Sequence, residues 1–264
     1  MNIVRYIINF TAERRERDFE MTIELNKIYQ GDCLEVMKQI PDKSVNVILC
    51  DMPYGFTTCK WDKIIDIKSI WKIYKRIIKC NGAIILTACQ PFTSKLIMSN
   101  LKMFKYCWVW DKSKTTGFLN CKKQPLRRTE DIIIFYKNQC VFNPQMVEGE
   151  PYTRIRLNNK CEVYDKFQTN TTFNNGQYYP TNVININQSN PIFHPTEKPV
   201  MLFKYLILTY SNLGDLILDN CIGSGTTAVA AKELGRNFIG IEINPKYIKI
   251  ANRRLAQKVL WDAK

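Results

Sequence analysis

Short apolar runs alternate along the chain with longer segments in which apolar residues recur at helical spacing. The runs predict buried strands, because they are too short for helices and polar turns bound them. They lie at residues 45–50, 83–88, 106–110, 132–136, 215–219 and 237–241. The helical spacing predicts helices at residues 65–78, 200–210, 226–234 and 245–257. Alternating strands and helices are typical of an α/β fold with a doubly wound, mostly parallel sheet, whose ligands bind at the carboxyl ends of the strands.

Two segments break this pattern. Residues 1–20 show no clear periodicity, and we interpret them as an N-terminal extension. Between residues 142 and 190 neither period holds for long, and asparagine supplies nine of the thirty-three residues from Asn158 to Asn190. A structureless insertion of this length is unusual in a compact domain unless it is functional, so we interpret 142–190 as a small inserted recognition region. The segments 21–141 and 191–264 then form the two halves of the main domain.

The charge balance favours a polyanionic partner such as nucleic acid. The 264 residues include 38 Lys and Arg against 24 Asp and Glu, a formal net charge of +14. Seventeen basic and five acidic residues lie between Lys60 and Lys137, interleaved with aromatic residues. Within this stretch the polar segment 111–128 is the candidate for contacts with DNA phosphates. The candidate side chains are Lys112, Lys114, Lys122, Lys123, Arg127 and Arg128.

Composition also argues against several classes of protein. The sequence has no apolar run long enough for a membrane span, and its first residues carry charges where a signal peptide is apolar, which predicts a cytoplasmic protein. Ten cysteines without a Cys-x-x-Cys pair predict reduced thiols and no structural zinc site. His194 is the single histidine, which disfavours hydrolase triads.

A glycine-rich turn follows the predicted strand that ends at Asp219. Gly223 and Gly225 let the backbone of this turn approach a ligand, and the carboxylate of Glu242, at the end of the next strand, could hold two ribose hydroxyls. The pattern indicates a nucleoside site. The turn also satisfies a relaxed dinucleotide pattern, but too few residues follow it for the second half of a nicotinamide-binding fold. A purely structural turn is the remaining alternative.

A second candidate site is Asp-Met-Pro-Tyr-Gly at residues 51–55, directly after the strand 45–50. The Asp51 carboxylate could accept one N–H of a planar amine, and a carbonyl of the turn could accept the other. The exposed ring of Tyr54 could stack on the base that carries the amine. An ordinary turn at the end of a strand is the alternative.

Together these motifs resemble the beta class of DNA amino-methyltransferases, which use S-adenosylmethionine to methylate N6 of adenine or N4 of cytosine. The order of the motifs is similar to that class, with residues 51–55 first, the variable region in the middle and the glycine-rich turn last. Gly31-Asp32-Cys33-Leu34 and His194-Pro-Thr-Glu-Lys-Pro199 resemble two further motifs. The resemblance covers residues 21–255. It implies a Rossmann-like methyltransferase fold, with the catalytic half at 21–141 and the cofactor-binding half at 191–264.

The resemblance also implies roles for individual residues. Asp51 would accept a hydrogen bond from the target amine, Met52 would act through its main-chain carbonyl, Pro53 would stiffen the turn and Tyr54 would stack on the flipped base. The implied cofactor contacts are Asp32 at the adenine, Glu242 at the ribose, Asp219, Gly223 and Gly225 at the methionine part, and Thr196 and Lys198 near its carboxylate. This chain departs from the pattern at Met52, in place of a proline, and at Asn220-Cys221, in place of Pro-Phe.

The implied reaction is direct, in-line transfer to a base flipped out of double-stranded DNA, with no metal ion. In this family an initial Asp occurs more often with adenine, so Asp51 favours N6 of adenine, and N4 of cytosine is the alternative. No proline is followed by cysteine, which disfavours C5 methylation of cytosine. RNA or protein-amide methylation and an inactive DNA-binding homologue are further alternatives. Residues 158–190, with Arg154 and Arg156, are candidates for base recognition. The sequence leaves the oligomeric state open, although many members of the class are dimers and a homodimer is one possible state.

Overall fold

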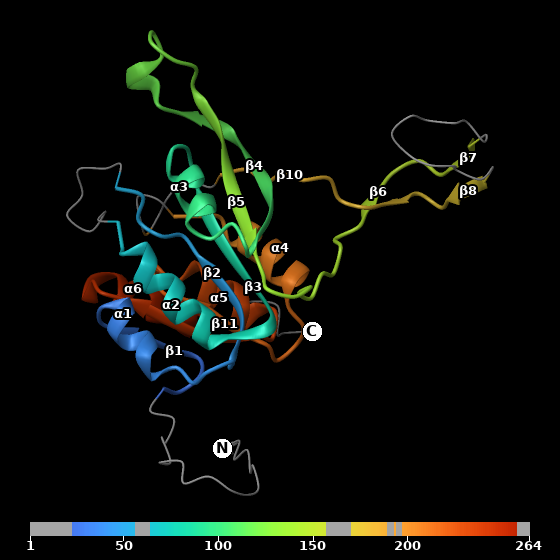
Figure 1. Ribbon diagram of the computed structural model, residues 1–264. Coiled ribbons are helices and arrows are strands. Elements are labelled where there is room, and N and C mark those ends of the chain that lie inside the picture. Colours follow the sequence, from blue (N-terminus) through green and yellow to red (C-terminus); the bar gives the residue numbers. More distant parts are fainter. Residues whose placement is uncertain (1–22, 56–63, 157–169, 189–192, 194–196, 258–264) are drawn as a thin grey trace, which may run out of the picture.

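A mixed sheet of eight strands runs through the computed structural model, which describes residues 23–55, 64–156, 170–188, 193 and 197–257. Its strands are β1 (Lys27–Gln30), β2 (Val45–Cys50), β3 (Ile78–Ala88), β4 (Phe104–Thr116), β5 (Arg127–Phe135), β10 (Val183–Asn185), β11 (Leu216–Asp219) and β12 (Asn237–Glu242). Their spatial order is β1-β12-β11-β2-β3-β5-β4-β10 (Figure 1). Within the described sheet, β5 is antiparallel to both neighbours and the other pairings are parallel. The predicted doubly wound, mostly parallel sheet is therefore confirmed.

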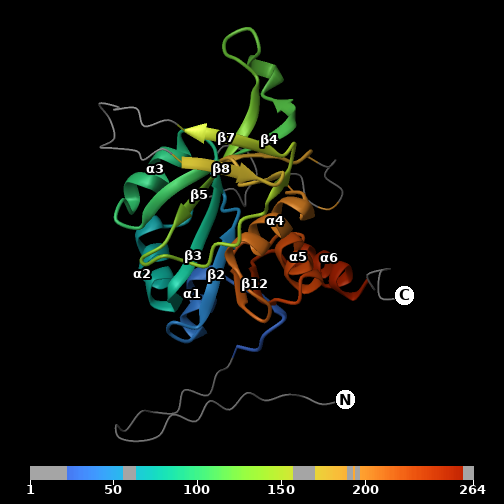
Figure 2. The same ribbon diagram turned by 90° about the vertical axis from the view of Figure 1, so that its right-hand side faces the viewer.

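Helices cover both faces of this sheet (Figure 1, Figure 2). The four predicted helices are confirmed to within a few residues. Before the hairpin, the sequence did not predict β1, α1 and α3. Strand β1 and helix α1 have only four residues each, and α3 lacks a pronounced amphipathic pattern. The helices are α1 (Cys33–Val36), α2 (Ile67–Ile77), α3 (Phe92–Ser99), α4 (Val200–Tyr210), α5 (Thr226–Glu233) and α6 (Pro245–Ala256).

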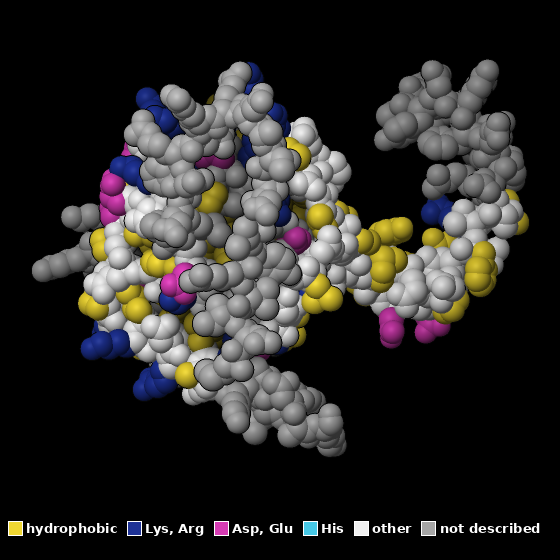
Figure 3. All heavy atoms as spheres, turned by 90° about the horizontal axis from the view of Figure 1, so that it is seen from below, with side chains coloured by type: hydrophobic (Ala, Val, Ile, Leu, Met, Phe, Trp, Pro, Cys, Tyr) yellow, Lys and Arg dark blue, Asp and Glu magenta, His cyan; other side chains and the backbone are white. Residues whose placement is uncertain are grey.

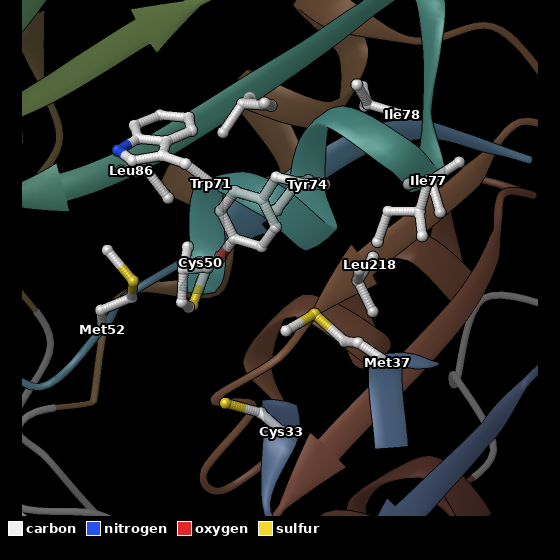
Figure 4. Packing of buried hydrophobic residues seen from close by; sticks show 14 of the residues in the cluster. Cys33, Met37, Cys50, Met52, Trp71, Tyr74, Ile77, Ile78, Leu86 and Leu218 are labelled. Atoms are coloured by element: carbon white, nitrogen blue, oxygen red, sulfur yellow. The ribbon is translucent and has the colours of Figure 1, made fainter. Parts of the chain in front are cut away.

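Each face of the sheet has its own hydrophobic core. Along β2, Ile48 and Cys50 belong to one core while Val47 and Leu49 belong to the other, as expected because successive side chains of a strand point to opposite faces. In the first core Trp71, Tyr74 and Ile77 of α2 pack near Leu86, Leu218 and Cys50 of the sheet (Figure 4). In the second core α4 contributes Leu202, Phe203, Leu206 and Ile207. Burial on both faces explains why β2 is apolar at nearly every position.

The basic segment 111–128 is not the loop between strands that the sequence predicts. Strands β4 and β5 continue into it as an antiparallel hairpin, with Asp111 opposite Thr129 and Thr116 opposite Arg127. The hairpin extends beyond the body of the protein and carries a short 3-10 turn, η2 (Phe118–Asn120), near its tip (Figure 1). Residues 113–116 are exposed on both faces of the hairpin. Polar residues are therefore suitable at every position, and the alternation of apolar and polar residues that identifies a strand is absent.

The predicted insertion is only partly separate from the main domain. Strand β10 lies within residues 142–190, yet it pairs in parallel with β4 and forms an edge of the main sheet. Two small ladders reach away from the sheet (Figure 1, Figure 2). They pair β6 (Val147–Glu148) with β9 (Gln177–Tyr178) and β7 (Tyr152–Arg156) with β8 (Asn170–Asn174). The predicted extension, residues 1–20, lies outside the described residues. Among the described helices none is long and apolar enough to span a membrane.

Two glycines offer a matched test of backbone conformation and packing. Gly225, before α5, has φ +88°, and an added Cβ would lie 2.7 Å from the Cβ of Ala251 in α6. Gly214 has φ +78° with no atom within 4 Å of an added Cβ. We expect Gly214→Ala to lower the free energy of unfolding by about 1–2 kcal/mol through the left-handed conformation alone. Gly225→Ala should lower the free energy of unfolding by about 1–3 kcal/mol more than Gly214→Ala does, because the added methyl group overpacks the contact with α6. Urea unfolding of both variants measures the difference, and equal losses would contradict this packing.

Candidate active site

A cavity of about 970 Å³ opens at the carboxyl edge of the sheet and unites the two predicted motifs. Asp51 follows β2, Asp219 ends β11 and Glu242 ends β12, and these parallel strands deliver the three carboxylates to one edge. The predicted residues that line this cavity are Asp32, Asp51, Met52, Pro53, Tyr54, Lys198, Asp219, Gly223 and Glu242, together with Lys112 and Arg127 from the basic segment. Thr196 and His194 lie outside the described residues.

The Asp51 carboxylate is held by three donors. Its Oδ1 accepts hydrogen bonds from the Tyr54 hydroxyl at 2.5 Å and from the Thr87 hydroxyl. Its Oδ2 accepts from Nζ of Lys198 at 2.7 Å. Because these donors come from three separate segments, they fix the direction in which the carboxylate faces.

Lys198 stands in a buried row of alternating charges. Its Nζ lies 2.7 Å from Asp51 Oδ2 and 3.4 Å from Glu130 Oε2, and Lys112 Nζ donates to Glu130 Oε1 at 3.1 Å. The side chains of Lys198 and Lys112 are 7% and 3% exposed. Burial by itself lowers the pKa of Lys198, but the Asp51 and Glu130 carboxylates outweigh it and raise this pKa above its ordinary value. We call Asp51, Lys198, Glu130 and Lys112 the charge row.

The charge row changes the picture of two predicted contacts. Lys198 faces Asp51 and Glu130 in this structure, whereas the resemblance implies a place near the cofactor carboxylate. Lys112 was expected to meet DNA phosphates, but its ammonium is buried against Glu130, so this expectation is wrong for the conformation seen here. The other basic candidates of the hairpin are exposed, namely Lys114, Lys122, Lys123, Arg127 and Arg128.

The glycine-rich half of the cavity holds two carboxyl groups, of which Asp219 is buried and Glu242 is partly buried. Asp219 accepts hydrogen bonds from the Thr227 hydroxyl and from the backbone N–H of Cys221 at 3.0 Å, and burial raises its pKa to about 7. Glu242 accepts from the backbone N–H groups of Gly223 at 3.0 Å and Asn244 at 2.8 Å. Burial raises the pKa of Glu242 as well. Each carboxyl group thus stands beside the turn that joins β11 to α5.

The departures from the family pattern are accommodated by the first core. The Met52 side chain is buried in this core, which leaves its main-chain carbonyl as its polar group at the turn (Figure 4). Asn220 is buried, and its Oδ1 accepts a hydrogen bond of 2.5 Å from the Tyr74 hydroxyl of α2. Cys221 lies beside Cys33 and Cys50. The cysteines of the described residues are free thiols, and burial raises the pKa of Cys50 to about 12.

Sequence reasoning missed Thr87 and Glu130, although both have a weak signal. Thr87 is a polar residue in the otherwise apolar run 83–88, and Glu130, with Asp131 after it, is acidic within the basic stretch. Each contacts a partner far away in the sequence: Thr87 donates to Asp51, and Glu130 pairs with Lys198. Neither contact follows from local spacing.

Comparison with known proteins finds similarity to DNA methyltransferases. A family model described as DNA methylase matches residues 45–253. The DNA adenine methyltransferase YhdJ of Escherichia coli K12 is 31% identical over 251 residues, which cover 88% of this chain and 83% of YhdJ. The crystal structure of the M1.HpyAVI–SAM complex is 24% identical with a TM-score of 0.60, covering 88% of this chain and 99% of that one. The cytosine-N4-specific PvuII DNA methyltransferase is 16% identical with a TM-score of 0.64, covering 88% of this chain and 87% of that one.

The doubly wound sheet has the Rossmann-like methyltransferase fold. The chain belongs to the N6/N4 DNA methylase family, whose methyl donor is S-adenosylmethionine. The resemblance identified from the sequence is thereby confirmed.

The residues around the glycine-rich turn fit this donor. Gly223 lines the cavity with φ +51°, so its backbone can approach a ligand there, whereas Gly225 is not among the lining residues and packs against Ala251 of α6. The carboxyl groups of Asp219 and Glu242 supply acceptors for an ammonium group and for ribose hydroxyls. The apolar side chains of Leu34 and Ile243 line the cavity next to Asp32 and Glu242 in the chain, as a planar base requires.

The charge row makes a testable statement about stability. Lys198→Met leaves the partly buried Asp51 and Glu130 carboxylates without their shared cation, so we expect the free energy of unfolding at pH 7 to fall by about 3–5 kcal/mol. Lys204, which pairs with Glu233 and is more exposed, is the matched control. Lys204→Met should cost about 0–1 kcal/mol. Urea unfolding compares the two variants, and similar losses would show that the charge row is not a buried network.

Proposed function

We propose that this protein transfers a methyl group from S-adenosylmethionine to the exocyclic N6 of adenine in double-stranded DNA. The observation that carries the proposal is the single cavity in which the Asp51 turn and the glycine-rich turn meet. A methyl donor held at the glycine-rich turn and an amine held at Asp51 would share this cavity. The net charge of +14 and the exposed basic hairpin support a DNA substrate.

The proposed mechanism follows from the weak nucleophilicity of an aromatic amine. Asp51 accepts one N–H of the amine and the Met52 carbonyl accepts the other, which localises the nitrogen lone pair. Bound S-adenosylmethionine supplies a methyl group on a positively charged sulfur. The nitrogen forms its bond to this methyl as the carbon–sulfur bond breaks, and the nitrogen then loses a proton, for which the Asp51 carboxylate is an acceptor. Lys198 acts as a positioning residue that holds the Asp51 carboxylate in its orientation through the contact with Oδ2.

The ring of Tyr54 is proposed to receive the flipped base. It lines the cavity and packs against Phe92 with ring centroids 5.4 Å apart, while its hydroxyl contacts Asp51. A base that stacks on this ring would bring its exocyclic amine to the Asp51 carboxylate. The stack would offset part of the cost of removing the base from the duplex.

Adenine is favoured over cytosine by two observations. The motif begins with Asp51, and YhdJ, which is 31% identical, is described as an adenine methyltransferase. N4 of cytosine is the second candidate, because the fold is shared with the cytosine-N4-specific PvuII enzyme. The two reactions need the same hydrogen bonds to the amine.

Product analysis tests the proposal. The protein is incubated with unmethylated genomic DNA and isotope-labelled S-adenosylmethionine, and the digested nucleosides are identified by mass spectrometry. Labelled N6-methyladenine is the expected product, whereas N4-methylcytosine would keep the mechanism and change the base. A preparation that binds cofactor and DNA but leaves no label on DNA would contradict the proposal and favour an inactive DNA-binding homologue.

Two substitutions separate the proposed roles of the Asp51 turn. Asp51→Ala should abolish transfer and retain DNA binding, because the amine loses its acceptor while the hairpin is unchanged.

Tyr54→Ala should weaken binding of the flipped base by about 1–3 kcal/mol and leave cofactor affinity nearly unchanged. Transfer rates and calorimetric titration with the cofactor measure these effects. Near-normal turnover of Asp51→Ala, or an equal loss of both affinities in Tyr54→Ala, would remove the residue from its role.

Cofactor binding should depend on pH through Asp219. The pKa of Asp219 is raised from the ordinary value of 3.8 to about 7. Below pH 7 the carboxyl group of the free folded protein is therefore mostly protonated, whereas in an unfolded chain it would be ionised. The ammonium group of the methionine part favours the ionised carboxylate, so binding should release this proton. Affinity should therefore rise with pH, by up to about tenfold per unit below pH 7, and level off above it. Calorimetry in buffers of different ionisation enthalpy detects the proton that is released on cofactor binding. Asp219→Asn should show no such proton release. Affinity that does not change between pH 6 and 8 would contradict the role.

A further inference from the structure

The tip of the β4–β5 hairpin exposes two large apolar side chains. Phe118 is 76% and Leu119 is 98% exposed, and both belong to the short turn η2. The hairpin carries them away from the body of the protein (Figure 1, Figure 2). Neighbouring, fully exposed apolar side chains on a projecting element are typical of a contact surface.

The tip stands close to the mouth of the cavity. Both strands of the hairpin line the cavity, through Thr116 of β4 and through Arg127, Thr129 and Glu130 of β5. Phe118 is two residues beyond Thr116, which is at most roughly 7 Å of extended chain. The apolar tip and the site of methyl transfer are thus joined by a short, hydrogen-bonded ribbon.

The charges around the tip select a polyanion as its partner. Of the six basic residues in 112–129, Lys112 is buried against Glu130 and Arg128 pairs with Asp111 at 2.7 Å. The other four are exposed, namely Lys114, Lys122, Lys123 and Arg127, and the first three lie close to the turn on either side. Phosphates would pair with these cations, while stacked bases offer an apolar surface to the ring of Phe118.

Other exposed surfaces fit DNA less well. On the face seen from below, the visible Lys and Arg side chains lie in separate spots around the edge (Figure 3). The arm formed by β6 to β9 also exposes hydrophobic side chains, among them Phe173 and Tyr179, but it adds two exposed glutamates, Glu148 and Glu150. The hairpin is therefore the described element that combines apolar and basic side chains beside the cavity.

We propose that Phe118 and Leu119 form a wedge that enters duplex DNA beside the target base and fills the gap that the flipped base leaves. This inference rests on the proposed function. A base that moves into the cavity exposes the faces of its former neighbours, and the Phe118 ring and the Leu119 side chain replace the lost stacking. The lysines that follow the wedge hold the phosphates on either side.

The test compares duplex DNA with single strands of the same sequence. The double variant Phe118→Ala/Leu119→Ala is assayed with labelled S-adenosylmethionine on unmethylated genomic DNA, native or heat-denatured. The wedge is needed only where a base must leave a stack, so the rate on duplex DNA should fall at least about tenfold while the rate on single strands stays within about threefold. Phe118→Trp in the presence of Leu119 should keep most of the duplex rate, because it retains an aromatic ring.

Leu213→Ala is the matched control, since Leu213 is 78% exposed in the turn before β11, away from the hairpin. It should leave both rates unchanged. Equal losses on both substrates, or no loss on duplex DNA, would overturn the wedge. A double variant that turns a dimer into a monomer in sedimentation would also overturn it, since the tip would then contact a second copy of the chain. A wild-type protein that labels neither substrate would instead show that the proposed function fails.

Discussion

The parallel pairing of β2 with β11 is the constraint on which the rest of the site depends. Val47 lies opposite Ile217 and Ile48 opposite Leu218, although these residues are far apart in the chain. Because the strands are neighbours and run in the same direction, Asp51 and Asp219 emerge side by side at the carboxyl edge. A strand between them, or an antiparallel arrangement, would separate the amine site from the glycine-rich turn. The cores on both faces of the sheet hold this pairing in place.

The charge row is the second long-range constraint. It joins the turn after β2, the hairpin strand β5 and the segment before α4 through Asp51, Glu130 and Lys198. Each carboxylate in the row has a lysine partner, so the charges compensate one another. The row therefore connects the element proposed to contact DNA with the residue proposed to hold the amine. Burial that is costly for a single charge is tolerated here because the signs alternate.

The sequence predicts those parts whose signal is local. Strand β2 and helix α4 were predicted at their observed bounds, because burial on both faces makes β2 apolar and α4 is almost entirely apolar. The hairpin was missed because its residues are polar, and β10 was missed because it has only three residues. Strand β10 also pairs with β4, which is far away in the sequence. The motifs located the cavity, but the contact of Lys198 with Asp51 spans 147 residues and has no local pattern. Burial of Lys112 depends likewise on Glu130 across the hairpin.

The most direct test of the account is a crystal structure of the protein with S-adenosylhomocysteine, the product form of the donor. We expect the adenosine between Asp32 and Glu242, with the sulfur at the glycine-rich turn and facing the Asp51 carboxylate across the open cavity. The Asp51–Lys198 ion pair should persist in that complex. Ligand bound elsewhere, or a sulfur that faces away from Asp51, would contradict the claim that one cavity holds both the donor and the target amine.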